Sequence, residues 1–323
     1  MIVAVTGGSG IVGTAVVRHL LASGHEVTAL ARSAGAATPL EEQGARVVRG
    51  DVLEREALRR LMEGSQWVFH VAGVNELCPR DRARMWKVNV EAISGVVETC
   101  RQAGVRRLIH TSSAATIGEE AGTVGTEDSK HRGFFLSEYE RSKTVGERLI
   151  LDARDDLEVI SVNPSSVQGP GRATGTGALL LAAARGRLPL IVDTTFSFVD
   201  IDDCARGHLL AAEKGRSGER YILSGATLST RQTVRTINSL LGRHKGPWGL
   251  DPDAVTWAAP LVDRLFRVMG KESPLCAESV RVLRHGHRYD GTKATRDLGM
   301  VYTPSTDTFE RTLGWFREEG LLD

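Results

Sequence analysis

The chain has 323 residues, of which 41% are hydrophobic, a value that is ordinary for a globular protein and sufficient for a large core. Lysine and arginine number 41 against 40 acidic residues, and their scatter gives no sign of a nucleic-acid or membrane-surface partner. Residues 2–6 already form a strand pattern, which leaves no room for a signal peptide, and no apolar run approaches membrane-spanning length. We therefore expect a cytoplasmic protein that binds neither nucleic acid nor a membrane.

A glycine-rich turn follows the first apolar strand. Gly7 permits a tight turn, Gly10 lets a pyrophosphate approach the backbone, and Gly13 lets the next helix pack against the sheet. That helix, Ile11 to Ala22, begins at the turn with its amides directed at phosphate, which places Ile11 in the site as well. Strand, glycines and helix in this order predict a dinucleotide site rather than an ordinary turn.

The end of the second strand, residues 25–33, indicates which dinucleotide binds. An NAD site places a carboxylate there for the ribose 2′-hydroxyl, but this chain has Ala31, Arg32 and Ser33. A guanidinium binds a 2′-phosphate through charge-assisted hydrogen bonds, whereas a carboxylate repels it. We therefore predict NADP(H), with Arg32 and Ser33 among its ligands. The plainer alternative is that Arg32 is a solvated charge at a strand end.

Strand and helix patterns then alternate along the first half of the chain. The expected elements are a strand at 46–49, a helix at 54–62, a strand at 67–72, a helix at 82–103, a strand at 107–111, a helix at 137–152 and a strand at 158–163. Short apolar strands joined by amphipathic helices predict a parallel sheet covered on both faces, with right-handed crossovers. The expected class is α/β, a Rossmann-type doubly wound sheet.

The pattern loosens beyond residue 168. We expect a helix after the glycine-rich stretch 169–177, a return to the sheet edge over 196–205, a strand at 220–225 and mainly helices over 227–287. The predicted NADP-binding domain is residues 1–168 with returning segments at about 194–225 and 288–302. The smaller, mostly helical substrate lobe takes about 169–193, 226–287 and 303–323.

Cysteine and histidine positions predict no metal site. Their spacing indicates free thiols in a reducing compartment rather than zinc ligands or disulfides, for Cys78, Cys100, Cys204 and Cys276. His70, His110 and His208 lie in or beside apolar runs, which is typical of core or edge histidines rather than ligands.

Tyr139 and Lys143 lie four residues apart, and hence on one face of a helix. A phenol titrates near pH ~10, and a neighbouring ammonium favours the phenolate, which suits proton transfer near neutrality. The pair alone is common by chance. Ser113, at the end of the strand 107–111, reaches the sheet edge where ligands of such folds bind, and it can donate a hydrogen bond to a carbonyl oxygen.

Further segments complete a family pattern. They are residues 6–13, 50–52, 69–73, Asn89, 111–113, Tyr139 with Lys143, and 163–170. Through them the chain resembles the extended short-chain dehydrogenase/reductase family over essentially its whole length. Residues 192–194, 199–210 and 218–225 are most similar to the dihydroflavonol-4-reductase-like branch, which includes hopanoid-associated sugar epimerases and lies near the 3β-hydroxysteroid dehydrogenases.

The resemblance implies a role for each matching residue. Tyr139 is the implied proton donor or acceptor, Lys143 binds the nicotinamide ribose and tunes Tyr139, and Ser113 polarises the substrate oxygen. The implied cofactor contacts are Asp51 and Val52 at adenine, Ala72 and Gly73 along the cofactor, and Pro164 to Val167 at the nicotinamide. Asn89 is implied to fix backbone near the active centre, although an ordinary polar helix residue is nearly as good an interpretation.

Departures from the family pattern narrow the substrate. Many nucleotide-sugar members have a tyrosine where this chain has Ile117, and many sugar dehydratases have an acidic pair where it has Ala114 and Ala115. The asparagine with which plant dihydroflavonol reductases contact a polyphenol has no match. The resemblance therefore argues against dehydration and against a flavonoid substrate.

We predict an NADP-dependent oxidoreductase that transfers hydride between nicotinamide and a carbonyl or secondary alcohol of a small, partly apolar substrate. The apolar preference rests on helical spacing within residues 254–269, namely Val255, Ala258, Val262, Phe266 and Met269. A diphosphate-linked sugar needs several cations, some of which Arg172 and Arg185 can supply. The alternatives are a nucleotide-sugar epimerase and a non-catalytic NADP-binding regulator, and a homodimer is left open.

Overall fold

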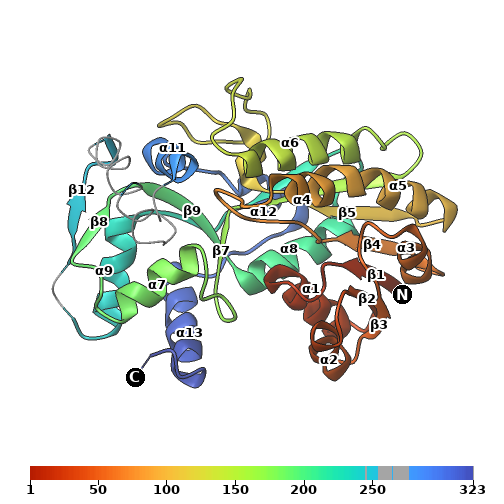
Figure 1. Ribbon diagram of the computed structural model, residues 1–323, viewed down its shortest axis with the longest axis horizontal. Helices are drawn as coiled ribbons and strands as arrows, with labels where there is room; N and C mark the ends of the chain where they lie inside the picture. Colours follow the sequence, from red (N-terminus) through yellow and green to blue (C-terminus); the bar gives the residue numbers. More distant parts are fainter. Residues whose placement is uncertain (244–245, 254–263, 265–275, 323) are drawn as a thin grey trace.

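The computed structural model describes residues 1–243, 246–253, 264 and 276–322. Its larger part is a parallel sheet of seven strands with helices on both faces (Figure 1). In spatial order the strands are β10 (Arg220–Leu223), β6 (Glu158–Pro164), β5 (Arg107–Thr111), β4 (Trp67–His70), β1 (Ile2–Thr6), β2 (Glu26–Ala31) and β3 (Arg46–Arg49). The reversal of strand order between β1 and β4 is that of a Rossmann-type doubly wound sheet, which confirms the predicted fold class.

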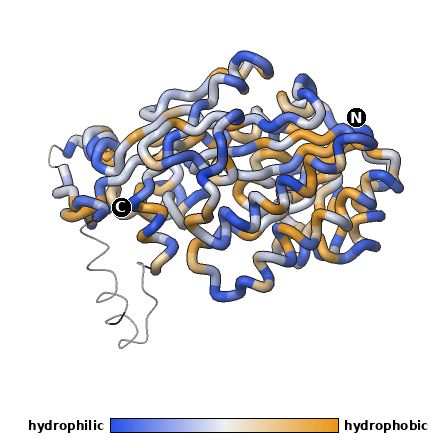
Figure 2. Tube along the Cα trace, turned by 90° about the horizontal axis from the view of Figure 1, so that it is seen from above, coloured by the Kyte–Doolittle hydropathy of each residue, from blue (hydrophilic) through white to orange (hydrophobic). Residues whose placement is uncertain are grey.

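Both faces of this sheet are buried, because successive side chains of its central strands enter different cores. Val3 and Val5 of β1 belong to one core and Ala4 to the other. The first core is closed by α1 (Ile11–Ala22), α2 (Ala34–Glu42), α8 (Ile201–Lys214) and α12 (Thr292–Leu298). The second is closed by α3 (Arg55–Met62), α5 (Ala92–Gln102) and α6 (Glu138–Leu151). Figure 2 shows hydrophobic residues concentrated along the strands between these layers.

A smaller lobe lies at the other end of the molecule (Figure 1). Its helices are α7 (Thr176–Ala184), α9 (Thr230–Leu240), α11 (Ala277–His285) and α13 (Ser305–Glu318). Its small sheets have the orders β11 (Ala226–Ser229), β9 (Thr195–Asp200), β7 (Ser166–Gln168), and β12 (Trp248–Leu250), β8 (Leu190–Val192). A third core, which includes Leu180, Phe198 and Phe309, holds this lobe together. The C-terminal region is therefore largely helical, as predicted.

Two expected elements differ in the structure. Residues 196–205 were expected to return to the edge of the main sheet, but β9 ends at Asp200, whose side chain accepts a hydrogen bond from Asp202 N and so begins α8. Moreover, β9 pairs with β7 and β11, while β10 forms the edge of the main sheet, so that prediction was wrong. The helix predicted over 82–103 is divided into α4 (Arg82–Trp86), a π-helical turn η1 (Lys87–Glu91) and α5.

The cysteine prediction was wrong for two of the four residues. Cys78 and Cys276 form a disulfide with Cα atoms 6.4 Å apart, while Cys100 and Cys204 are free and buried. The sequence spacing gave no sign of the pair, because the fold brings together a loop after β4 and the residue that caps α11. The cysteines therefore do not support the prediction of a reducing compartment.

Two further expectations concern the later part of the chain and the membrane. The apolar stripe predicted within 254–269 lies outside the described residues, apart from residue 264. Among the described helices, none combines the length and the apolar character needed to cross a bilayer.

Candidate active site

The glycine turn between β1 and α1 leaves a cradle that side chains would fill. Gly7 has a φ of 70°, and a Cβ on it would lie 2.5 Å from Ala72 N. A Cβ on Gly13 would lie 2.0 Å from Gly7 O, so a side chain is excluded at both positions. Gly10 caps α1 without a side-chain hydrogen bond, and Ile11 is exposed beside it. The amides of the first turn are thus open to a phosphate, and these residues fit a dinucleotide.

Arg32 and Ser33 follow the end of β2 but differ in their partners. Arg32 is exposed, and it makes no hydrogen bond or ion pair with any described residue. The hydroxyl of Ser33 accepts a hydrogen bond from Ala36 N at 3.3 Å and caps α2. The guanidinium is therefore available for an anion at the end of β2, whereas the serine already has a structural role.

The two residues predicted at adenine lie on the loop between β3 and α3, next to the end of β2. Gly50 N donates to Ala31 O at 3.1 Å and fixes this loop against β2. Asp51 Oδ1 accepts from Leu53 N at 3.0 Å, and Val52 is buried. The structure thus brings Asp51 and Val52 to the same sheet edge as Arg32.

The backbone after β4 is held by Asn89. Its amide oxygen accepts from Val74 N at 2.8 Å, and its amide nitrogen donates to Val74 O at 3.0 Å and to Ser142 Oγ at 2.9 Å. A Cβ on Gly73 would lie 3.4 Å from Asn89 Oδ1 and 3.7 Å from Lys143 Nζ. The π-helical turn η1, which contains Asn89, therefore fixes Gly73 between the sheet and α6, whereas Ala72 N is held by Thr6 Oγ1 at 3.3 Å.

Ser113 and Tyr139 meet at the carboxyl end of β5. Ser113 is buried at the start of the 3-10 turn η2 (Ala114–Ile117), where its hydroxyl accepts from Ala115 N at 3.2 Å. Tyr139 is half-buried in the first turn of α6. Burial raises the pKa of Tyr139, while a hydrogen bond from Ser113 and the charge of Arg172 oppose that rise. The phenol is therefore the protonated form at neutral pH.

Lys143 is buried one turn after Tyr139. Its ammonium donates a hydrogen bond to Thr111 O at 2.7 Å. Burial lowers the pKa of Lys143 to about 8, and the carboxylate of Glu147 opposes the shift. The structure does not give the expected lowering of the Tyr139 pKa by Lys143, because the ammonium is directed at the backbone of β5.

Asn163 supports the serine from the neighbouring strand, a role that no prediction assigned. Its amide nitrogen lies 3.2 Å from Ser113 O, 3.0 Å from Thr116 Oγ1 and 2.5 Å from Glu147 Oε1. Glu147 also accepts from Ser161 Oγ at 2.6 Å. One buried network therefore joins β6, η2 and α6 around Ser113. Asn163 opens the segment 163–170 that carries the family resemblance, and this position was the available sequence signal.

Two further predicted contacts lie after β6. Pro164 ends β6 and Val167 pairs with Val199 between β7 and β9, and both are buried. Beyond them, Arg172 is half-buried and donates to Thr174 O at 3.4 Å. Burial lowers the pKa of Arg172, and the neighbouring Tyr139 opposes that shift.

Three histidines of the predicted core lie beneath the site. His70, His110 and His208 are buried, and the rings of His70 and His110 stack with centroids 5.3 Å apart. Burial lowers the pKa of His70 to about 3 and that of His208 to about 4. All three are therefore neutral at neutral pH, in agreement with core positions.

Comparison with known proteins shows which family and which individual proteins this chain is similar to. The family model described as the NAD dependent epimerase/dehydratase family matches residues 3–224. A Methylococcus capsulatus protein described as sterol demethylase protein B is 32% identical over 98% of this chain and 99% of that protein. A Synechocystis protein described as a putative dihydroflavonol 4-reductase is 29% identical over 98% of this chain and 95% of that protein. The crystal structure of gox2253 superposes with a TM-score of 0.87 at 30% identity, covering 100% of this chain and 99% of that one.

Proposed function

Because this chain belongs to the NAD dependent epimerase/dehydratase family, as an extended short-chain dehydrogenase/reductase, we propose that it is an NADP-dependent carbonyl reductase or alcohol dehydrogenase. The observation that carries the proposal is that α6 brings Lys143, one turn after Tyr139, to the end of β5, where its ammonium donates to Thr111 O at 2.7 Å and adjoins Gly73. A substrate oxygen placed between the hydroxyls of Ser113 and Tyr139 lies at the carboxyl edge of the sheet, where the glycine turn also opens.

The two hydroxyls supply the proton chemistry. In the reductive direction both donate hydrogen bonds to the carbonyl oxygen, and Tyr139 gives up its proton as negative charge develops there. Because its pKa is raised, the phenol of Tyr139 holds at neutral pH the proton that this step transfers. When bound, the nicotinamide supplies or accepts the hydride. Lys143 places a buried positive charge next to Gly73, where it would hold the nicotinamide ribose.

Arg32 supports the choice of NADP over NAD. It is exposed at the end of β2 without a protein partner among the described residues, and Ala31 stands where an NAD site has its acid. A 2′-phosphate would give the guanidinium a charge-assisted partner.

The arginines support a substrate with little charge. Arg172 interacts with Tyr139, but Arg185 is exposed at the end of α7 and donates to Leu321 O at 2.9 Å. Of the two cations considered for a diphosphate-linked sugar, only Arg172 thus lies near enough to Tyr139 for its charge to lower the pKa of that residue. The relative described by its role in sterol demethylation further supports a partly apolar substrate.

A screen for cofactor consumption tests the proposal. The purified chain is supplied with NADPH and, in turn, with aliphatic, aromatic and steroidal ketones or aldehydes and with common nucleotide sugars. We expect stoichiometric NADPH oxidation with apolar carbonyls and no change in the sugars. Inversion of a sugar carbon without net NADPH oxidation would instead identify an epimerase. Tight NADPH binding without turnover of any compound would favour a regulator.

A further inference from the structure

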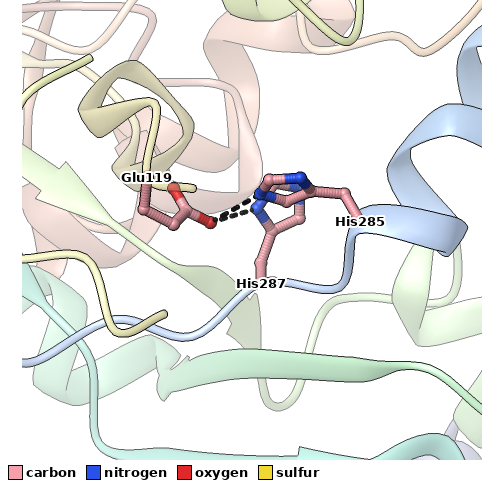
Figure 3. A group of neighbouring side chains, drawn as sticks. All are labelled: Glu119, His285 and His287. Atoms are coloured by element: carbon pink, nitrogen blue, oxygen red, sulfur yellow. Dashed lines mark hydrogen bonds and ion pairs between the residues drawn. The ribbon is translucent and has the colours of Figure 1, made fainter. Parts of the chain in front are cut away.

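The side chains of Glu119, His285 and His287 converge from two segments of the chain (Figure 3). Glu119 and His287 are separated by 168 positions in the sequence. Glu119 belongs to the loop that follows η2, and therefore to the segment that begins at Ser113. His285 is the last residue of α11, and His287 follows two residues later in the connection to α12. None of these three residues belongs to the set of Ser113, Tyr139 and Lys143 in the proposed active site.

The three side chains direct ligand atoms at a common point. Glu119 Oε1 lies 2.7 Å from His287 Nδ1 and 3.4 Å from His285 Nε2. One ligand atom from each residue lies within 4.8 Å of those of the other two. The side chains are 1%, 5% and 16% exposed for Glu119, His285 and His287 respectively. The group is thus nearly removed from water, which makes its unpaired atoms costly.

Hydrogen bonds within the group leave some of its buried polar atoms without a partner. His285 Nε2 and Glu119 Oε2 are buried and have no hydrogen-bond partner among the described residues. His287 Nδ1 lies 2.7 Å from Glu119 Oε1 and 2.9 Å from the hydroxyl of Tyr289. A ring nitrogen donates or accepts at one time, so this atom cannot donate to Glu119 and also accept from Tyr289. Buried polar atoms of this kind usually have a partner.

We propose that Glu119, His285 and His287 bind one divalent transition metal ion, with zinc as the favoured metal. Two imidazoles and one carboxylate form a known three-ligand zinc set. Magnesium and calcium prefer oxygen ligands, so two imidazole nitrogens argue against either of them. Zinc bonds of about 2.0–2.1 Å in a tetrahedron place ligand atoms about 3.3 Å apart. The distances of 2.7 and 3.4 Å from Glu119 Oε1 bracket that value, so small side-chain rotations suffice.

The surrounding backbone gives the ion a structural purpose. The segment that carries His287 is already joined to two neighbours, since His287 N donates to Thr195 O and Gly125 N donates to Arg288 O, both at 2.8 Å. A bound metal ion would form a third link, between the connection from α11 to α12 and the loop that follows Ser113. It would thus brace the smaller lobe against the catalytic segment.

Zinc affinity tests the site on the full chain. Protein treated with a chelator and then dialysed is titrated with Zn²⁺ in competition with a chromophoric chelator. We expect one ion per chain, and a loss of affinity of at least about 100-fold in His285→Gln and in His287→Gln, since even outer partners of a ligand contribute about 10–100-fold. His19→Gln is the matched control, because His19 Nε2 also adjoins a carboxylate, at 3.3 Å from Asp202 Oδ1, but has no second histidine.

Co²⁺ substitution keeps the test decisive if the variants fail to fold. The unsubstituted protein should show visible ligand-field bands of a nitrogen and oxygen tetrahedron, without the intense charge-transfer band of a thiolate. An absence of bound Zn²⁺ and of Co²⁺ bands would overturn the proposal. Full zinc affinity in folded His285→Gln or His287→Gln would overturn it too. NADPH titration of the same samples reports separately on the proposed enzyme, so failure of one does not imply failure of the other.

Discussion

The ammonium of Lys143 donates a hydrogen bond to the carbonyl oxygen of Thr111 across 2.7 Å, inside the protein rather than at its surface. The carbonyl belongs to the last residue of β5, directly before the serines of the proposed site. Burial lowers the pKa of this lysine to about 8 in spite of Glu147. At neutral pH the fold therefore carries a buried positive charge where a cofactor ribose would lie.

The pH dependence of stability should reveal this charge. Below pH 8 both the folded and the unfolded chain hold the proton of Lys143, whereas between about pH 8 and 10.5 only the unfolded chain does. Wild type should therefore gain stability relative to Lys143→Met as pH rises through that window, by up to about 3 kcal/mol. Urea unfolding at pH 7 and pH 10 measures the change.

Lys214→Met is the matched control for that comparison. Lys214 also donates to a backbone carbonyl, Leu298 O at 3.1 Å, but is exposed. The stability difference between wild type and Lys214→Met should stay constant between the two pH values. A constant difference for Lys143→Met as well would show that burial does not shift its titration.

Arg32→Ala should change the affinity for NADPH but not the affinity for NADH. Loss of a charge-assisted contact to the 2′-phosphate should weaken NADPH binding by about 1.5–3 kcal/mol and leave NADH binding nearly unchanged. Calorimetric titration with each cofactor gives both affinities, and the exposed Arg317→Ala on α13 serves as the control. Equal affinities of the unmutated chain for NADPH and NADH would refute the assignment.

Asn89→Asp should destabilise the fold around Gly73. A carboxylate cannot donate to Val74 O or Ser142 Oγ, both of which now accept from the Asn89 amide. We expect a loss of about 2–4 kcal/mol of unfolding free energy from the unpaired groups. The control is Asn75→Asp, an exposed neighbour that should change stability by less than about 0.5 kcal/mol. If urea unfolding gives the two variants equal stability, Asn89 does not hold the loop.

Thiol counting tests the disulfide. Alkylation of denatured protein should modify two cysteines without reductant and four after reduction, because Cys78 and Cys276 are paired. Cys78→Ser should cost about 2–4 kcal/mol of stability, since the bridge closes a loop with a sequence separation of 198 residues. Four reactive thiols in carefully oxidised protein would contradict the pairing.

Local patterns in the sequence predicted much of this protein. The glycine turn at Gly7 to Gly13 and the alternation of strands and helices predicted the doubly wound fold and the family. Both signals depend on residues that lie close together in the sequence. The spacing of Tyr139 and Lys143 likewise placed both on α6. Their catalytic roles, and the cofactor contacts of Arg32, stay predictions.

What the sequence did not predict depends on residues that meet only after folding. Cys78 and Cys276 are joined across 198 positions of the sequence, and Glu119 meets His287 across 168 positions. The pKa of Tyr139 is raised rather than lowered because burial outweighs its polar neighbours, and burial cannot be read from a spacing of four residues. The return to the sheet edge expected over 196–205 was wrong, because the cap formed by Asp200 begins α8 and β9 pairs with β7 and β11 instead.

Transfer of deuteride from [4,4-²H₂]NADPH tests the proposed chemistry most directly. With an apolar ketone found in the carbonyl screen, the account predicts one deuterium on the alcohol carbon for each NADPH consumed. In Tyr139→Phe the rate should fall by at least about 100-fold while NADPH binding is nearly unchanged, because only the transferable proton is removed. Undiminished deuteride transfer in Tyr139→Phe, or inversion of a nucleotide sugar with no net loss of NADPH, would contradict the account.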